Sequence, residues 1–276
     1  MVKNNLHIFN VTNRADALLD DLYCEPAGVG PNNFPDHYLD SRVGENIQHK
    51  DPYYAEYVFH YWFWKNQLMN YGNDAWLGFC QYRRYWLKEN CDQNLVITRE
   101  NLKDNVLSST PLIWSNYDAI VAKRVYVNSP KFMKLIKKGF RNILNDPTLI
   151  FDKRKHNVKL HFDMSHGYGK LDKAIELLDR IERDDFREYV NKNTFFNPNH
   201  MFISHPKIMN EWFKSVFSWF LKCEDIFIFK NLIGYEKRFY GYLGERYLSY
   251  WFNKYTNTIE WPWAFVDMNN GKRTDV

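Results

Sequence analysis

The sequence predicts an α/β protein with a mixed, mostly parallel central sheet flanked by helices and a helix-rich C-terminal half. Apolar strand-like segments alternate with helix-like segments through residues 1–128, an order that favours crossover connections. From residue 129 onward helical periodicity dominates. A chain of 276 residues with 45% hydrophobic content is long enough for one substantial core. We therefore expect a single domain over residues 1–268, made of an α/β part (1–128) and a helix-rich part (129–268), with a polar tail at 269–276.

The first half begins with a predicted buried strand over residues 6–11 and a short helix over 15–22. Residues 27–31 predict a turn. Residues 32–51 contain so many Asn, Asp, Pro and Gly residues that we expect mostly loop. A loop of that length inside a compact domain is typically functional.

A buried helix is predicted over residues 51–66, because the segment is apolar almost all round. Asp51 suits the N-cap of this helix and Pro52 its first position. A helix-like stretch at 99–107 then leads to a strand at 117–122.

The second half is predicted to be mainly helical. The elements in order are helices over 130–144 and 171–189, a strand over 199–204, and helices over 207–222 and 244–252. The lysines of the first helix indicate a solvated face, with contact to an anionic lipid surface as the alternative. We expect the aromatic helix at 207–222 to pack internally.

Composition excludes several classes of function. The net charge of +4 is mild and no run of five basic residues occurs, so we expect no nucleic-acid partner. The four cysteines are scattered, which favours free thiols in a reducing cytoplasm, and no apolar stretch reaches the length of a membrane span. We expect a cytoplasmic protein, with peripheral association at the inner face of the plasma membrane as the alternative. The aromatic content of 18% is typical of core packing, of sugar stacking or of an AT-rich genome.

The segment at residues 78–86 is the strongest functional signal. An apolar run ends there in two adjacent arginines, Arg83 and Arg84. A buried strand that ends in guanidinium groups can hold phosphate at the sheet edge. The alternative is surface charge among packed aromatic rings.

Metal and acid–base chemistry have weaker signals. His161, Asp163 and His166 have an H-x-D-x-x-H spacing, but no second ligand cluster accompanies it, so we expect no metal site. His166 and Asp172 flank a glycine-rich turn where they could face a ligand, or Asp172 could merely favour the helix dipole.

Glu245 follows Gly241 and Gly244 at the predicted start of the last helix. A carboxylate fixed there could take a proton from a sugar hydroxyl. A glutamate that only complements the helix dipole is the equal alternative. The motifs of serine hydrolases, P-loop enzymes, dinucleotide-binding enzymes and zinc proteases are missing.

Several motifs together resemble those of one family over about residues 6–252. They are GENI at 44–47, YxE at 54–56, YWxWKN at 61–66, GFCQYRRY at 78–85, NHMFI at 199–203 and GYLGER at 241–246. The chain resembles the bacterial capsule and O-antigen galactofuranosyltransferases, once described as a domain of unknown function.

The resemblance implies a GT-A-like glycosyltransferase that moves galactofuranose from UDP-galactofuranose to a hydroxyl of a lipid-linked glycan, with inversion at the anomeric carbon. It implies that Arg83 and Arg84 replace the metal-binding Asp-x-Asp of many such enzymes, so no cofactor is expected and magnesium or manganese (Mg or Mn) is the less favoured alternative. Glu245 is the expected base, and Asp172 and Asp118 are the reserve candidates. The expected UDP-sugar contacts are Arg83, Arg84, Tyr82, Gln81, Asn46, Glu56, Lys65, His166, Arg246 and Gly244.

The sequence also departs from the family pattern. Gln81 stands where a histidine is usual, His200 interrupts an Asn-Met-Phe run, and Glu45 replaces a common aspartate. These departures leave the donor sugar open. The alternatives are a transferase for a UDP-pyranose, such as UDP-galactose or UDP-glucose, and a non-catalytic glycan-binding subunit.

Overall fold

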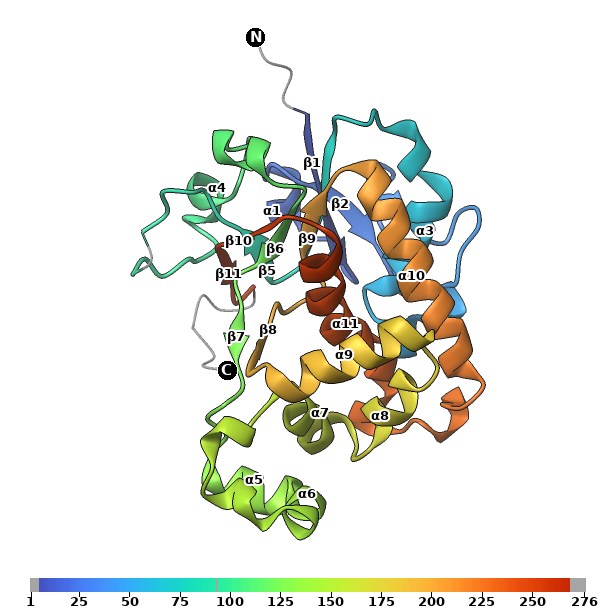
Figure 1. Cartoon of the computed structure of the whole chain (residues 1–276). Helices are drawn as coiled ribbons and strands as arrows, with labels where there is room; N and C mark the ends of the chain where they lie inside the picture. Colours follow the sequence, from blue (N-terminus) through green and yellow to red (C-terminus); the bar gives the residue numbers. More distant parts are fainter. Residues whose placement is uncertain (1–4, 93, 269–276) are drawn as a thin grey trace.

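A nine-stranded mixed sheet forms the centre of the computed structural model, which describes residues 5–92 and 94–268 (Figure 1). Its strands are β1 (Leu6–Thr12), β2 (Glu25–Gly28), β3 (Leu39–Asp40), β4 (Trp76–Gln81), β5 (Arg84–Trp86), β6 (Ala119–Ala122), β9 (Phe202–Ser204), β10 (Thr258–Trp261) and β11 (Trp263–Phe265). A separate pair joins β7 (Val125–Tyr126) to β8 (Phe195–Phe196). Strand β7 precedes the helical residues 132–192, and β8 follows them.

The main path of the sheet has the strand order β10-β6-β9-β4-β1-β2-β3, and most of its adjacent pairs are parallel. Strand β9 is antiparallel to both of its neighbours, β4 and β6, and the other adjacent pairs in this order are parallel. All strands of this order except β9 therefore point the same way. Strands β5 and β11 extend the sheet as antiparallel additions beside β4.

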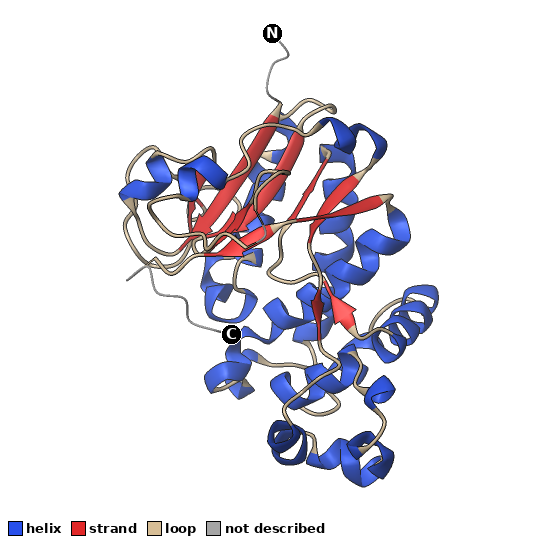
Figure 2. Ribbon diagram, turned by 90° about the vertical axis from the view of Figure 1, so that its left-hand side faces the viewer, coloured by secondary structure: helices blue, strands red, loops and turns tan. Residues whose placement is uncertain are grey.

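Helices cover both faces of the sheet (Figure 2). They are α1 (Ala17–Asp20), α2 (Asp51–Tyr54), α3 (Tyr57–Asn66), α4 (Leu102–Asn105), α5 (Phe132–Lys138), α6 (Phe140–Asn145), α7 (Val158–His166), α8 (Lys170–Ile175), α9 (Arg180–Lys192), α10 (Pro206–Glu224) and α11 (Phe239–Tyr255). Short 3₁₀ helices lie at Gln48–Lys50, Leu68–Asn70, Leu112–Asn116, Pro147–Ile150, Lys153–Lys155, Phe229–Asn231 and Gly234–Arg238.

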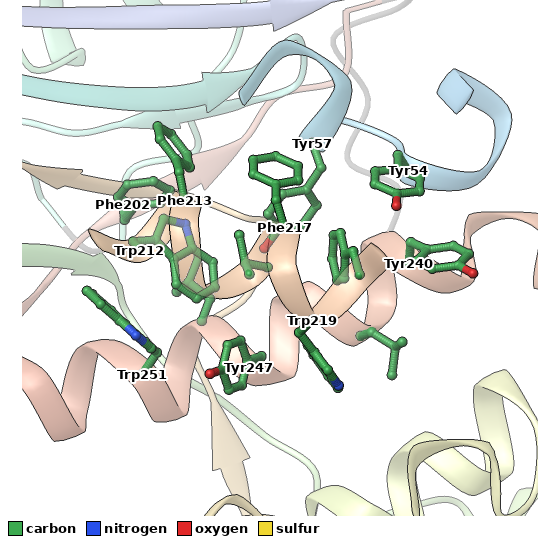
Figure 3. Close-up of a cluster of buried hydrophobic side chains, with 14 of the residues drawn as sticks. Tyr54, Tyr57, Phe202, Trp212, Phe213, Phe217, Trp219, Tyr240, Tyr247 and Trp251 are labelled. Atoms are coloured by element: carbon green, nitrogen blue, oxygen red, sulfur yellow. The ribbon is translucent and has the colours of Figure 1, made fainter. Parts of the chain in front are cut away.

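Alternation along the strands divides the core in two. Phe9 and Phe79 face the larger cluster, which contains residues of α3, α10 and α11. Ile8 and Trp76 face the other side, where residues of α1 and α4 pack. Helix α10 carries its aromatic side chains into the larger cluster, and Trp212 is fully buried (Figure 3). The prediction that the 207–222 helix packs internally is confirmed.

The structure corrects three predicted elements of the first half. Part of the predicted turn at 27–31 belongs to β2, because pairing with β1 holds that backbone extended. The predicted helix at 51–66 is two helices, since Ala55 adopts a φ of 54° between α2 and α3. Asp51 is the first residue of α2 rather than its cap, and its side chain lines a cavity.

Three helices of the second half also differ from the prediction. The segment 130–144 is divided at Gly139 into α5 and α6, and 171–189 is divided into α8 and α9. Helix α11 begins at Phe239, so Glu245 lies in its second turn and not at its N-terminus. Strands β10 and β11 follow α11 and were not predicted. The polar tail at 269–276 lies outside the described residues.

No helix in the described part of the chain has the length and apolar character needed to cross a bilayer.

Candidate functional site

A cavity of about 320 Å³ lies at the carboxyl ends of the parallel strands β1, β2 and β4. Side chains from the ends of β1 and β4, from α2 and from the residue before α11 converge on it. Its lining residues are Val11, Asn13, Val29, Asp51, Pro52, Ala55, Glu56, Gln81, Tyr82, Arg83, Arg84 and Arg238. Ligands of open α/β sheets bind at this edge, so the cavity is the candidate active site.

Arg83 and Arg84 form its basic wall, at the turn between β4 and β5. Arg84 donates a hydrogen bond of 2.7 Å from Nη1 to the side-chain oxygen of Gln81, and burial lowers the pKa of its guanidinium. Neither arginine forms an ion pair within residues 5–92 and 94–268. Two partly buried guanidinium groups that form no ion pair are suited to an anionic ligand.

Gln81 connects this wall to the loop before β9. Its Nε2 donates a hydrogen bond of 2.6 Å to the backbone oxygen of Asn199, while its Oε1 receives the bond from Arg84. Asn199 has a φ of 75° and His200 a φ of 55°, so two consecutive non-glycine residues adopt the left-handed region here. Gln81 thus holds Arg84 against a strained loop.

Tyr82 contributes a phenol ring to the cavity. Its hydroxyl lies 3.2 Å from Asp16 Oδ2, and Arg14 stacks its guanidinium 4.3 Å from the ring centroid. Asp16 also accepts two hydrogen bonds from Arg99, which lower the pKa of its carboxyl to about 2. This charged network fixes the turn that carries Arg83.

Glu56 and Asp51 form the acidic wall. Arg238 donates from Nη2 to both oxygens of Glu56 at 3.2 Å, and His200 Nδ1 lies 3.2 Å from Glu56 Oε2. Burial raises the pKa of Glu56, but the hydrogen bond from His200 and the charge of Arg238 outweigh it and lower the pKa overall. Burial and the neighbouring Glu56 raise the pKa of Asp51.

The break at Ala55 explains how one short segment supplies both carboxylates. A continuous helix would turn Asp51 and Glu56 to different sides, because five residues span about 500° at 3.6 residues per turn. The positive φ of Ala55 redirects the chain between them. Both side chains therefore line the same cavity.

Glu245 lies beside this cavity rather than in its lining. Its Oε1 accepts a hydrogen bond of 2.7 Å from the backbone N–H of Asn199, and its Oε2 pairs with Arg246. The side chain is 14% exposed. Burial lowers the pKa of the Arg84 guanidinium, and the negative charges of Glu56 and Glu245 oppose that effect.

Arg246 and His166 do not line the cavity, and their contact with a UDP-sugar stays a prediction. Arg246 is fully buried, with Nη2 3.2 Å from His161 Nδ1 and 3.4 Å from His166 Nε2. His166 stacks on Tyr242 at 3.8 Å between ring centroids. Burial and the charge of Arg246 lower the pKa of both histidines, that of His161 to about 3.

The H-x-D-x-x-H residues also point in different directions. Asp163 accepts hydrogen bonds from Asn142, Lys159 and the backbone of Gly169, away from the two imidazoles. Among the described residues no group of three or more His, Cys, Asp or Glu side chains is arranged to hold a metal ion.

Four further predicted site residues lie elsewhere. Asp172 pairs with Lys159 of α7 at 3.1 Å. Asn46 bonds to the backbone of its own loop, and the Lys65 ammonium lies 4.1 Å from the ring centroid of Trp64. Gly244 lies inside α11 and packs on Tyr57 of α3. The structure therefore gathers Gln81, Tyr82, Arg83, Arg84 and Glu56 at the cavity and leaves these four outside it.

Three residues of the site were missed by the sequence-based prediction. Asp51 was interpreted as a helix cap, Arg238 precedes the GYLGER motif, and His200 was noted only as a departure from a pattern. Arg238 and His200 meet Glu56 only through long-range folding. Their sequence signal was position, because His200 lies within the NHMFI motif and Arg238 lies shortly before the GYLGER motif.

Comparison with known proteins agrees with this architecture. The fold matches the apo structure of a bifunctional glycosyltransferase, WbbM, with a TM-score of 0.72 and 20% sequence identity. The match covers 98% of this chain and 47% of that one, so this chain spans about half the length of WbbM. The likeness confirms the predicted GT-A-like α/β fold with its mostly parallel sheet.

No curated protein sequence matches the chain. A family model described as a domain of unknown function (DUF4422) matches residues 7–257, nearly the whole chain, which therefore belongs to the DUF4422 family.

Proposed function

We propose that this protein is a glycosyltransferase that binds the diphosphate of a nucleotide sugar in the cavity at the carboxyl edge of the sheet. The observation that carries the proposal is the basic wall, where Arg83 and Arg84 line the cavity and form no ion pair within the described residues. Planar guanidinium groups bind phosphate oxygens in pairs, and a partly buried position strengthens that attraction. The fold shared with a glycosyltransferase supports the same class of reaction.

The donor that we propose is UDP-galactofuranose, and the acceptor is a hydroxyl of a lipid-linked glycan in capsule or O-antigen synthesis at the cytoplasmic side of the membrane. The support is the set of motifs shared with bacterial galactofuranosyltransferases. Two of them, YxE and GFCQYRRY, line the cavity, and NHMFI contacts the lining residues Gln81 and Glu56 through Asn199 and His200. Asp51 and Glu56 can accept hydrogen bonds from hydroxyl groups of the donor.

The reaction that we propose is an inverting displacement. The acceptor oxygen forms a bond to the anomeric carbon while the bond from that carbon to the UDP oxygen breaks, and the electron pair leaves with UDP. Arg83 and Arg84 stabilise the negative charge that develops on UDP. Glu245, beside the basic wall and held by the Asn199 N–H, takes the proton of the acceptor hydroxyl.

UDP release by the purified protein tests the donor. We expect release from UDP-galactofuranose in the presence of acceptor, and little from UDP-galactose or UDP-glucose. Release from a pyranose donor instead would reassign the sugar. If neither UDP nor any UDP-sugar raises the melting temperature, the transferase proposal is wrong and a glycan-binding role remains.

Variants and a chelator test the assigned residues. We expect Arg83→Ala combined with Arg84→Ala to lower kcat/KM by about 100-fold or more. Arg180→Ala, which changes an exposed arginine on α9, should leave kcat/KM unchanged.

Transfer should persist in EDTA, because the arginines act where a metal would. Loss of transfer in EDTA that only Mg or Mn restores contradicts that role. Near wild-type transfer by Glu245→Gln together with an inactive Asp172→Asn would move the base to Asp172.

A further inference from the structure

Residues 129–157, here called the basic arm, form a small helical unit at the end of the molecule away from the sheet (Figures 1 and 2). The arm contains α5, α6 and two 3₁₀ helices. Leu135 and Leu149 pack it onto Leu160 and Met164 of α7. This small cluster is separate from the two larger cores, so the arm is a surface element rather than part of the catalytic body.

The arm concentrates the positive charge of the protein. It holds eight Lys and Arg residues and two Asp residues, a net charge of +6, while the whole chain carries +4. The rest of the chain therefore has a net charge of −2. Arg154 and Lys155 pair with the two aspartates. The remaining basic side chains are exposed and form no ion pair within the described chain: Lys131, Lys134, Lys137, Lys138, Arg141 and Lys153.

The same arm exposes large apolar side chains. Phe132, Met133, Phe140, Leu144 and Phe151 are between 55% and 86% exposed. Exposed aromatic and aliphatic side chains grouped on one element indicate an interaction surface.

Helix geometry places these apolar groups beside the lysines rather than among them. Leu135 faces the interior of the arm. At about 100° per residue, Phe132 and Met133 lie to one side of it, whereas Lys134 and Lys138 lie to the other. On α6, Phe140 and Leu144 are four residues apart and share a face. An apolar flank next to a basic flank is typical of helices that lie in a membrane interface.

We propose that the basic arm is a docking surface for an anionic lipid bilayer. Its apolar side chains enter the boundary between headgroups and acyl chains, and its unpaired lysines meet the lipid phosphates. Charge complementarity selects this occupant, because the cations have no acidic partner in the described chain while the rest of the protein is acidic. Docking in this way would bring the cavity to a membrane that carries a lipid-linked acceptor, but the binding itself needs no step of the proposed transfer.

Vesicle binding by the full chain tests this proposal. We expect co-sedimentation with vesicles in which about a third of the lipid is phosphatidylglycerol, little with phosphatidylcholine alone, and release at high salt. Replacement of Lys134, Lys137 and Lys138 by Gln should weaken binding by about 100-fold. The matched control replaces the exposed Lys123, Lys173 and Lys207 by Gln, which changes the net charge equally and should leave binding nearly unchanged.

Replacement of Phe140 and Phe151 by Ser should also weaken vesicle binding, without a change in the melting temperature, since both rings are exposed. UDP release with a soluble acceptor should stay at the wild-type level in every arm variant, so loss of docking is distinguishable from loss of catalysis. Equal loss of binding in the control triple, equal binding to neutral vesicles, or self-association through the arm without vesicle binding would each overturn the proposal.

Discussion

Gln81 determines where the guanidinium of Arg84 lies, because it is the acceptor that Arg84 contacts at 2.7 Å. Its amide N–H₂ is held at the same time by the Asn199 carbonyl, so the side chain cannot rotate without loss of one bond. An amide suits this position because it offers a donor and an acceptor together. Gln81 thus positions Arg84 for a ligand without neutralising its charge.

This role predicts the effect of Gln81→Glu. The new carboxylate would pair with Arg84 and offset the charge that a diphosphate needs, so we expect UDP to bind about 10 to 100 times more weakly. Gln81→Met, which removes both hydrogen bonds without adding charge, should weaken binding less. Isothermal titration with UDP measures both, and Gln67→Glu at the C-cap of α3, outside the cavity lining, controls for the added charge. Unchanged UDP affinity in Gln81→Glu would show that Arg84 does not meet the diphosphate.

The contact between α11 and α3 depends on two glycines inside a helix. A Cβ at Gly244 would lie 2.4 Å from the Tyr57 ring, whereas a Cβ at Gly241 would lie 3.2 Å from the Ala55 side chain. The two glycines, placed from the sequence at the start of the last helix, lie inside α11 and form a flat helix face that allows close approach. This approach places Glu245, one residue after Gly244, next to the loop at Asn199.

We therefore expect Gly244→Ala to destabilise the fold, although alanine is the better helix former by about 1 kcal/mol. Overpacking against the buried Tyr57 should lower the free energy of unfolding by about 1 to 3 kcal/mol net. Chemical denaturation measures this change. Gly241→Ala should cost less, and Tyr57→Leu should recover part of the loss in a double-mutant cycle. A Gly244→Ala protein more stable than the wild type would mean that the helices separate without cost.

Over the whole molecule, the elements and residues that were predicted correctly are those with a local pattern in the sequence. Strands β1 and β6 were predicted because most of their residues are apolar, and the arginines because a strand end fixes their position. The break at Ala55 was missed because alanine rarely adopts a positive φ and gives no signal for it. The salt bridge between Arg238 and Glu56 joins residues far apart in the chain, and no local pattern reports such a contact.

The buried histidines predict how the whole fold responds to acid. The ring of His60 is 1% exposed and neither nitrogen has a hydrogen-bond partner within the described residues. Burial, with a smaller contribution from His200, lowers the pKa of His60 from 6.5 to about 3. His161 and His166 shift in the same direction, and Asp16 and Glu56 have lowered pKa values as well.

Between about pH 6.5 and pH 3 the unfolded chain binds protons that the buried ring of His60 does not, so the unfolded state gains stability as the pH falls. This single histidine should lower the free energy of unfolding by about 1.4 kcal/mol per pH unit in that range. The lowered carboxyl pKa values act in the same sense, because their stabilisation is present at neutral pH and is lost as acid protonates them. We therefore expect the melting temperature to fall steadily below about pH 6.5. His60→Leu, close in volume, should make that decline shallower, whereas His49→Leu on the surface should leave it unchanged. An equally steep decline in His60→Leu would mean that the imidazole takes up its proton inside the folded protein.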